Sequence, residues 1–526
     1  IWSMEVAWQV HEGILMNTGA LFEGWLGRRD WRNYVVDARI TVGTVQTETA
    51  ALRLIGRRQK SGDAFALELA QGELRLLVLE GSETRTLASM PAALQEGGPL
   101  LLRLGLFEDV LMGQMNSEKP LIVNLDASLA ETRIAGQAGV ASCGVAFSLE
   151  AFQVAALDAP SLPRSNIAPD PGYFPPGIER SAGARDIMLI YSGHYASGVG
   201  EWDIADAMPY LAYVQYADGQ AEFRDWFFDT FLFLGLQAPS GRAFDSPARA
   251  TPANMDDWQW YLDTIFQEKK QLSAFSEALQ SLKGRLDDPN YRARVIIIIP
   301  HPIISQRDFG DVDGDGISED FSPRPQGVAL AEEARWQAVK WYVDEVERRW
   351  RESGYANLEL AGYYWLDEHL GTHGGITPDT LIKRTVDYLH VMNRRLFWIP
   401  YFHAERYDKA YETGLDCVIM QPNYMFDRKI PRSRFEILTN TAKREYFGVE
   451  IEADGSVLNS EAGRQRYLDY LRAGVTYGYM TDAIHAYYQD AKVLLHAAYS
   501  RDPAIRAVYD ATYAFVKGEF DEPLHE

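Results

Sequence analysis

Two pairs of acidic side chains are the residues of this sequence best suited to chemistry. Asp367 and Glu368 directly follow the apolar run 358–365, and Glu450 and Glu452 lie at the end of a second apolar run. Two carboxyls can cleave a glycosidic bond when one donates a proton and the other stays ionised, so their surroundings must differ. The alternative interpretation is that Asp367 caps the next helix and Glu368 is simply solvated.

The elements that must position these carboxyls are parallel strands. From residue 186 onward the sequence alternates apolar runs with amphipathic segments of helical period, the strongest being 255–286, 330–351 and 378–392. The eight candidate strands are 186–191, 227–236, 294–300, 358–365, 395–402, 415–420, 445–451 and 474–480. Segment 209–220 is compatible with an extra strand or a helix. This pattern predicts a (β/α)8 TIM barrel over residues 186–520, with catalytic groups at the strand C-terminal ends.

The placement of the carboxyls after the fourth and in the seventh of these strands resembles the clan A-type retaining glycoside hydrolases. The resemblance implies an O-glycosyl hydrolase in which Glu368 is the acid/base and Glu450 the nucleophile. Glu452 has the same strand parity as Glu450 and is the competing nucleophile. The clan usually has Asn where this chain has Asp367, which puts the correspondence in doubt.

Two other interpretations of the same residues stay open. An adjacent Asp-Glu pair also resembles the substrate-assisted hexosaminidases, in which Asp367 would orient a 2-acetamido group and Glu450 would only bind. A non-catalytic glycan-binding protein on a degenerate barrel is the third possibility. The segments IYSGHY (190–195), YYWLDEH (363–369), QPNYMF (421–426) and FGVEIEA (447–453) also resemble a bacterial barrel family of unknown function found in exported polysaccharide-related proteins.

Further polar and aromatic residues near the ends of the predicted strands are candidates for sugar binding. The polar candidates are His194, His301, His403, Asn423 and Asp482, and the aromatic candidates for stacking on sugar rings are Tyr364, Trp365 and Tyr424. Each of them is also compatible with a purely structural role. The sequence lacks HExxH, catalytic GxSxG, P-loop and GxGxxG motifs, which disfavours metalloprotease, α/β-hydrolase, NTPase and Rossmann dehydrogenase functions.

Residues 1–157 form a different type of domain. Short alternating runs separated by turn residues predict an all-β sandwich. Trp31-Arg32-Asn33-Tyr34 and the segment 136–140 (GQAGV) resemble the concanavalin A-like lectin/glucanase jelly roll. The resemblance implies either a carbohydrate-binding module or a structural partner. Residues 158–185 are rich in Pro, Gly and Ser and predict an extended linker between the two domains.

The segment 311–322, DVDGDGISEDFS, predicts a structural calcium site. Its beginning follows the D-x-D-x-D-G pattern of calcium loops. The predicted ligands are Asp311, Asp313, Asp315, the carbonyl of Ile317, and Glu319. Position twelve is Ser322 rather than an acidic residue, so Asp320 or another segment would have to complete the site. An exposed acidic turn without a metal is the alternative.

Composition limits the possible partners. The 526-residue chain has a net charge of −23, which argues against nucleic acid and anionic membranes. The resemblances described above imply a carbohydrate as the partner. Two cysteines exclude a disulfide framework, and no apolar run reaches the length of a membrane span. The resemblance to a family found in exported proteins implies a bacterial secreted, periplasmic or cell-surface protein, and we expect that the sequence, which starts at Ile1, is a trimmed or mature form without its signal peptide. The oligomeric state, the sugar and the anomer are not predicted, and no organic cofactor is expected.

Overall fold

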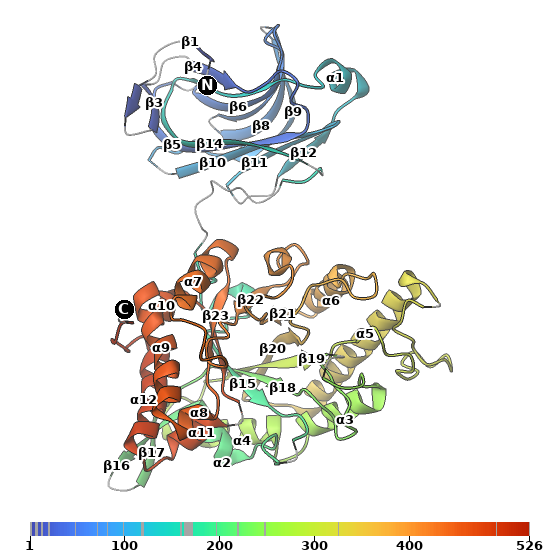
Figure 1. Ribbon diagram of the computed structural model, residues 1–526, viewed down its shortest axis with the longest axis vertical. Helices are drawn as coiled ribbons and strands as arrows, with labels where there is room; N and C mark the ends of the chain where they lie inside the picture. Colours follow the sequence, from blue (N-terminus) through green and yellow to red (C-terminus); the bar gives the residue numbers. More distant parts are fainter. Residues whose placement is uncertain are drawn as a thin grey trace. The chain divides into compact units, whose positions relative to one another are not determined.

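The computed structural model divides the chain into two compact units, residues 1–169 and 170–526 (Figure 1). It describes residues 3–524 except 6–8, 12–13, 19–21, 48, 71, 82, 98, 117–119, 158–159, 163–171, 196, 218–219, 247–248, 325 and 491. No described helix has the length and apolar composition needed to cross a membrane.

The first unit consists of two antiparallel, jelly-roll-like sheets. One has the strand order β1-β4-β13-β6-β7-β8-β9 and the other β12-β11-β10-β5-β14-β3-β2. Leu, Val and Phe side chains that alternate along the strands meet between the sheets as one core. The strands are β1 (Ser3–Glu5), β2 (Gln9–His11), β3 (Ile14–Thr18), β4 (Phe22–Leu26), β5 (Tyr34–Val45), β6 (Ala51–Arg58), β7 (Ala64–Ala70), β8 (Gly72–Glu80), β9 (Glu83–Ala92), β10 (Pro99–Phe107), β11 (Val110–Met115), β12 (Leu121–Asn124), β13 (Gln137–Cys143) and β14 (Val145–Ala156), with the short helix α1 (Ala127–Thr132).

The second unit is built on eight parallel strands that close into a barrel. Most of these strands are continuous runs of buried apolar residues, as expected for parallel strands covered on both faces. The barrel strands are β15 (Asp186–Tyr191), β18 (Thr230–Leu234), β19 (Ala293–Ile299), β20 (Leu358–Trp365), β21 (Arg395–Trp398), β22 (Cys417–Met420), β23 (Gly448–Glu452) and β24 (His485–Tyr488). Each pairs with its neighbour in this order, and β24 pairs with β15.

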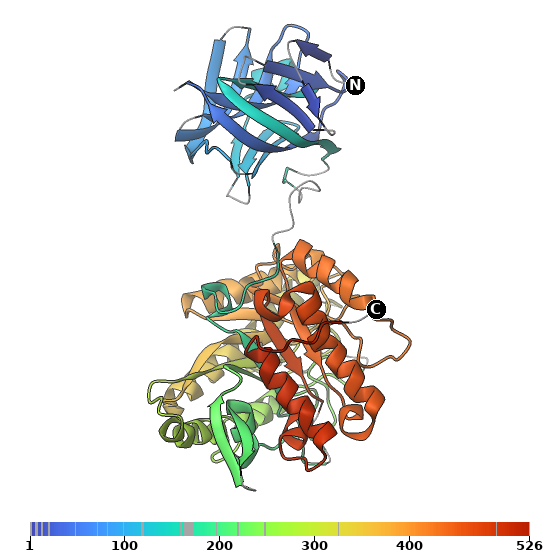
Figure 2. The same cartoon turned by 90° about the vertical axis from the view of Figure 1, so that its left-hand side faces the viewer.

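The helices around this barrel do not follow the strands one to one. Between β21 and β22, a segment that is described throughout, the only helical element is the 3-10 turn η2 (Tyr407–Lys409), and the β15–β18 connection contains the antiparallel hairpin β16 (Ala212–Ala217) and β17 (Gln220–Trp226). The other helical elements are η1 (Glu179–Ser181), α2 (Ile204–Leu211), α3 (Met255–Ile265), α4 (Gln271–Arg285), α5 (Val328–Ser353), α6 (Asp379–Val391), α7 (Arg434–Glu445), α8 (Ser456–Asn459), α9 (Glu461–Tyr477), α10 (Tyr479–Asp482), α11 (Val493–Ala498) and α12 (Pro503–Val516). Figure 2 shows α9 and α12 side by side on the outside of the barrel.

The predicted fold class is therefore wrong in its helical layer. A (β/α)8 barrel requires a helix after every strand, and the helices here are too few and too unevenly placed for that repeat. The closed parallel barrel needs no such repeat, because each strand makes its backbone hydrogen bonds with its two neighbours around the circumference.

The eighth predicted strand is also wrong. Residues 474–480 belong to the end of α9 and the start of α10, and the eighth strand is β24. Asp482 consequently lies before the strand, at the opposite end of the barrel from the strand C-termini, and its exposed carboxylate accepts a hydrogen bond from Thr481 (2.9 Å).

The described part of the predicted linker is not wholly extended. Residues 172–185 pack onto the barrel unit, where the Phe174 amide donates to the Phe447 carbonyl and the Ile484 amide donates to the Phe174 carbonyl. Most of the remaining linker, residues 163–171, lies outside the described residues.

Candidate functional site

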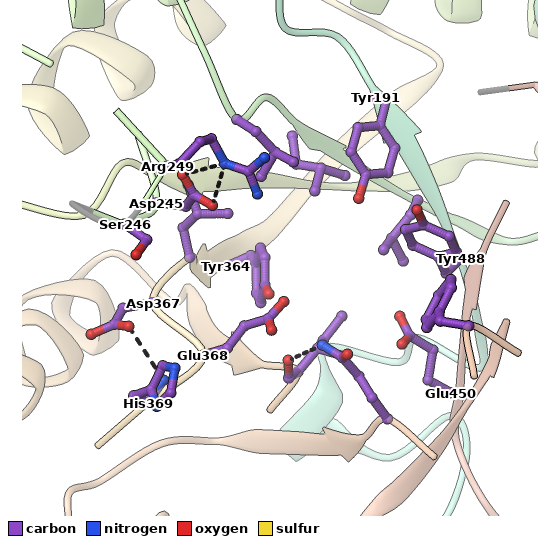
Figure 3. Close-up of a pocket in the computed structure, with 17 residues that line it drawn as sticks. Tyr191, Asp245, Ser246, Arg249, Tyr364, Asp367, Glu368, His369, Glu450 and Tyr488 are labelled. Atoms are coloured by element: carbon purple, nitrogen blue, oxygen red, sulfur yellow. Dashed lines mark hydrogen bonds and ion pairs between the residues drawn. The ribbon is translucent and has the colours of Figure 1, made fainter. Parts of the chain in front are cut away.

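A cavity of about 400 Å³ lies at the C-terminal ends of the barrel strands (Figure 3). Ligands of parallel sheets bind at this end because the loops there can differ without disturbing the strands. Four carboxyls, one arginine and several aromatic rings surround the cavity. Its lining residues are Leu189, Tyr191, Leu234, Leu236, Asp245, Ser246, Arg249, Tyr364, Leu366, Asp367, Glu368, His369, Ile399, Gln421, Phe426, Glu450 and Tyr488.

Glu368 reaches the cavity from the loop that follows β20. The indole Nε1 of Trp398 on β21 donates to the Asp367 carbonyl at 2.8 Å and holds this loop against the barrel. The Glu368 side chain projects into the cavity towards the side occupied by Glu450 (Figure 3). Burial raises the pKa of Glu368 to about 7, although a hydrogen bond from Gln421 opposes this rise. Glu368 can therefore carry a proton at neutral pH, which a general acid requires.

Glu450 lies in the middle of β23 with its side chain directed into the barrel. Its neighbours Val449 and Ile451 point to the other face and are buried. The residue is 2% exposed, and no hydrogen bond or ion pair to its carboxyl is found among the described residues. Burial, and secondarily the charges of Glu452 and Glu368, raise the pKa of Glu450 well above its usual value.

Glu452, the competing nucleophile, does not line the cavity. Its carboxylate accepts hydrogen bonds from the Asn423 amide at 3.0 Å and from the Tyr470 hydroxyl on α9. Burial raises the pKa of Glu452 to about 7 in spite of these bonds. Of the two glutamates on β23, Glu450 is thus the one that faces the cavity.

Asn423 holds the loop after β22 in a conformation that most residues avoid. Its φ is +50°, its side-chain oxygen accepts from the Phe402 amide at 2.8 Å, and its own amide donates to Glu452. Asn423 therefore supports the wall of the site and does not line the cavity.

Replacing Asn423 by Ala should lower the free energy of unfolding by about 1–3 kcal/mol, because a part-buried hydrogen-bond acceptor is lost and the left-handed backbone is disfavoured. Urea denaturation measures the change. The matched control is Asn393→Ala, since Asn393 also has positive φ (+55°) but is exposed, and its described hydrogen bonds are made by the backbone. Equal losses in the two variants would show that the Asn423 side chain contributes nothing beyond its backbone preference.

Asp367 faces a different group of side chains from those that surround Glu450. Its carboxylate lies 3.6 Å from His301 Nε2 and accepts from the His369 amide at 3.3 Å. Burial raises the pKa of Asp367 to about 7, and the buried guanidinium of Arg335 opposes the rise. Burial also keeps the pKa of His301 well below its usual value, so this imidazole is neutral. His301 thus contacts a cavity-lining carboxylate without lining the cavity.

The aromatic lining comes from residues that alternate along the strands. Tyr364 faces the cavity, while its neighbour Trp365 is fully buried on the other face of β20 and does not reach it. Tyr191 and Tyr488 end β15 and β24 and meet edge to face at a ring separation of 5.8 Å. Phe426 lines the cavity, is 49% exposed, and meets Tyr488 edge to face at a ring separation of 5.3 Å.

Three other predicted sugar-binding residues lie away from the cavity. His194 is exposed and packs against Trp260, and His403 is exposed beside Phe402. Tyr424 is buried, and its hydroxyl donates to Asp469 at 2.9 Å. These residues follow the strands in the sequence, but the loops place their side chains outside the lining of the cavity.

Sequence reasoning missed several residues that do line the cavity. Tyr191 and Gln421 occupy strand ends, next to the residues that were selected instead. Tyr488 was missed because the eighth strand was misplaced. Asp245 and Arg249 lie in the long loop after β18, where no periodicity marks them, and the Arg249 Nε donates to Asp245 at 2.8 Å.

The predicted calcium ligands are partly brought together. Carboxylate oxygens of Asp311, Asp313 and Asp315 lie within 4.8 Å of one another on an exposed loop. Glu319 is instead turned towards the Val312 amide, which donates to its carboxylate at 3.1 Å, and the Ile317 side chain is exposed.

A family model describes most of the barrel unit. The model for "Domain of unknown function (DUF4855)" matches residues 186–514, more than half of the chain. The chain belongs to the DUF4855 family. In the DUF4855 region, the matched residues include all eight barrel strands and the complete lining of the cavity. No curated protein matches the sequence.

Solved structures that match are similar to this DUF4855 protein over less than a third of its length. The carbohydrate-binding module CBM66 from Bacillus subtilis is 9% identical, covers 30% of this chain and 95% of the module, and has a TM-score of 0.26. Sheep galectin-11 is 13% identical over 26% of this chain and 100% of the galectin, with a TM-score of 0.21. An alginate lyase A1-II′ variant is 10% identical over 28% of this chain and 83% of the lyase, with a TM-score of 0.23.

These comparisons correct the expected relationship of the DUF4855 protein. The resemblance to clan A-type retaining glycoside hydrolases is corrected, because the family model that matches the barrel is DUF4855 and not a glycoside hydrolase of that clan. Similarity at this level carries no argument about activity, so any function has to be inferred from the site itself.

Proposed function

We propose that the cavity is a carbohydrate site in which Glu368 and Glu450 cleave a glycosidic bond. The observation that carries the proposal is the placement of these two carboxyls on opposite sides of one cavity (Figure 3). In the proposed reaction Glu368 protonates the leaving oxygen while Glu450 attacks the anomeric carbon. Water, deprotonated by Glu368, then releases the sugar with retention of configuration.

The two carboxyls of the pair lie in different surroundings. Glu368 is at the loop end of the pair and has the Gln421 hydrogen bond, whereas Glu450 lies within the strand without a described partner. Positive charge develops at the anomeric carbon in the transition state, and it would favour the ionised form of Glu450 at that moment. The Tyr364 and Phe426 rings supply apolar surface on which a sugar face can pack.

The position of Asp367 disfavours the substrate-assisted alternative. Its carboxylate lies on the side of His369 and His301, away from the gap between Glu368 and Glu450 (Figure 3). A residue that orients a 2-acetamido group would have to reach that gap.

Glycan binding without turnover is the second candidate function. The observation that favours it is the high pKa of Glu450, which burial keeps protonated in the free protein although a nucleophile must be ionised. A binding site would use the same protonated carboxyl as a hydrogen-bond donor to a sugar hydroxyl.

The test is hydrolysis across a panel of aryl glycosides and plant, algal and bacterial polysaccharides, followed by proton NMR of the first product formed from any substrate that is cleaved. The proposal expects cleavage of at least one class with retention at the anomeric carbon. Binding of glycans without cleavage of any of them would establish the second candidate and contradict the first. Cleavage with inversion would contradict the role of Glu450 as nucleophile.

We also propose that the loop 311–319 binds calcium. Three carboxylates this close repel one another unless a cation neutralises them. Asp313→Asn should weaken calcium binding, measured by isothermal titration calorimetry, by about tenfold or more, which is 1.4 kcal/mol. Asp387→Asn, which removes one negative charge at an exposed position of α6, should leave the affinity unchanged. Absence of calcium binding to the wild type would mean that the loop is an acidic turn.

A further inference from the structure

Acidic side chains outnumber basic side chains around the cavity. Arg249 is the one cationic side chain among its lining residues, and it is committed to Asp245 through an ion pair of 2.8 Å (Figure 3). Asp367 has the Arg335 guanidinium nearby. Glu368 and Glu450 have no cation of their own among the described residues, and Glu452 lies buried beside Glu450.

The carboxyls are spread around the wall and are not gathered about a point. Among the described residues, the one group of three potential metal ligands with atoms within 4.8 Å of one another is in the loop 311–315, far along the chain from the cavity carboxyls. The cavity therefore does not offer a ready metal site. Its volume of about 400 Å³ suits a ligand of sugar size.

A second observation points to the same kind of ligand. Glu450 is almost completely buried, is directed into the cavity, and has no described hydrogen-bond partner. Its carboxyl is therefore open to a ligand in the cavity, and among the described residues no protein group competes for it. A ligand that donates hydrogen bonds and brings positive charge would satisfy it.

We propose that the cavity of this protein recognises glycans whose sugar residues carry a free, protonated amino group, such as de-N-acetylated hexosamine polymers. This inference rests on the proposed carbohydrate function and names its substrate class. The ammonium group donates up to three hydrogen bonds to Glu368 and Glu450 and favours the ionised forms of these carboxyls. An N-acetylated sugar lacks the charge, and a uronate would add a negative charge to a cavity that is already lined by acidic groups.

The inference also explains how Glu450 becomes ionised. An ammonium group within a few ångströms favours the carboxylate over the carboxylic acid. The amino sugar would thus supply the positive charge that the protein does not place beside Glu450, and a neutral sugar would not.

The experiment compares matched oligosaccharides that differ only in the N-acetyl group. Glucosamine and galactosamine tetramers and their N-acetylated forms are titrated into the full-length protein by calorimetry near pH 6.5, and cleavage products are analysed in parallel. We expect the free amines to bind at least about tenfold more tightly than the N-acetylated forms, and the difference to shrink as salt is raised.

Variants separate the charge of the cavity from the charge of the whole protein. Asp245→Asn leaves Arg249 unpaired in the cavity and should weaken amine binding about tenfold, with little effect on any neutral glycan. Asp387→Asn removes one negative charge on the exposed side of α6, outside the cavity lining, and should change neither.

The outcomes distinguish this inference from the proposed hydrolase. Binding of the amines without cleavage would support the inference and would contradict the proposed hydrolysis. Cleavage of neutral glycans that depends on Glu368, with no preference for amines, would keep the hydrolase and overturn the inference. Failure of every free-amine oligosaccharide to bind would also overturn it.

Discussion

Replacing Glu368 by Gln lowers kcat/KM on an unactivated glycoside by about 10³-fold, within the 10²–10⁴ range typical for loss of a general acid–base. Gln has nearly the same size and can still hydrogen-bond with Gln421, but it has no acidic proton for the leaving oxygen. The loss should be much smaller in the glycosylation step of a substrate whose leaving group departs without a proton, such as a dinitrophenyl glycoside. Initial-rate kinetics on the two substrate types measures both effects.

The control for this variant is Asp387→Asn, which changes net charge by the same amount at an exposed position of α6. It should leave kcat and KM unchanged. Retention of more than about a tenth of the wild-type rate by Glu368→Gln on the unactivated glycoside would exclude Glu368 as the general acid.

Replacing Glu450 by Gln should abolish turnover and at the same time stabilise the protein at alkaline pH. The wild-type carboxyl has a pKa raised by burial in the folded state, whereas in the unfolded chain it is near 4.5. The folded state therefore binds more protons than the unfolded state above pH 4.5. The contribution of this carboxyl to the free energy of unfolding is consequently highest below this pH and falls as the pH rises. Asp367, Glu368 and Glu452, with pKa values of about 7, contribute in the same direction between about pH 4 and 7.

The expected gain for Glu450→Gln at pH 8 is about 1–3 kcal/mol, because the variant no longer pays for an unpaired buried carboxylate. Urea denaturation of the full chain from pH 4 to pH 8, followed by tryptophan fluorescence, measures the change. The slope of stability against pH should be shallower in the variant than in the wild type. A variant that is less stable than the wild type at pH 8, with an unchanged slope, would show that Glu450 is stabilised by a contact that offsets its burial.

The sequence predicts the fold best where a strand is an almost uninterrupted run of buried residues. The run 358–365 has no polar interruption except Glu359, so its strand and the position of Glu368 after it could be predicted. The same holds for β23, where the alternation of Glu450 with Val449 and Ile451 places the carboxyl inside the barrel.

The eighth strand was misplaced because two local signals compete. The run 474–480 is rich in β-branched and aromatic residues, but it continues the helical period of the preceding turns, and α9 extends to Tyr477. The true strand β24 has four residues, too few for a periodic signal. Tyr488 was lost from the predicted site, and Asp482 was included, for this reason alone.

The remaining lining residues could not be predicted because loops set their positions. Asp245 and Arg249 lie in the long loop after β18, and Phe426 extends from the loop after β22. Loop backbone depends on contacts such as that of Asn423 with Phe402, which join residues far apart in the sequence. The uneven helical layer also could not be predicted from a periodic pattern. The segment between Trp398 and Cys417 lacks the apolar periodicity of an amphipathic helix, and its one helical element is η2.

The most direct test of the central claim is covalent labelling of the nucleophile. The protein is incubated with a 5-fluoro glycosyl fluoride of the sugar identified in the hydrolysis panel, which keeps the substituent at C2, and is then digested and analysed by peptide mass spectrometry. The proposal predicts one added glycosyl group on the peptide that contains Glu450, and no label in Glu450→Gln. A label on any other residue, or none at all with a substrate that is turned over, would contradict the assignment of Glu450 as the nucleophile opposite Glu368.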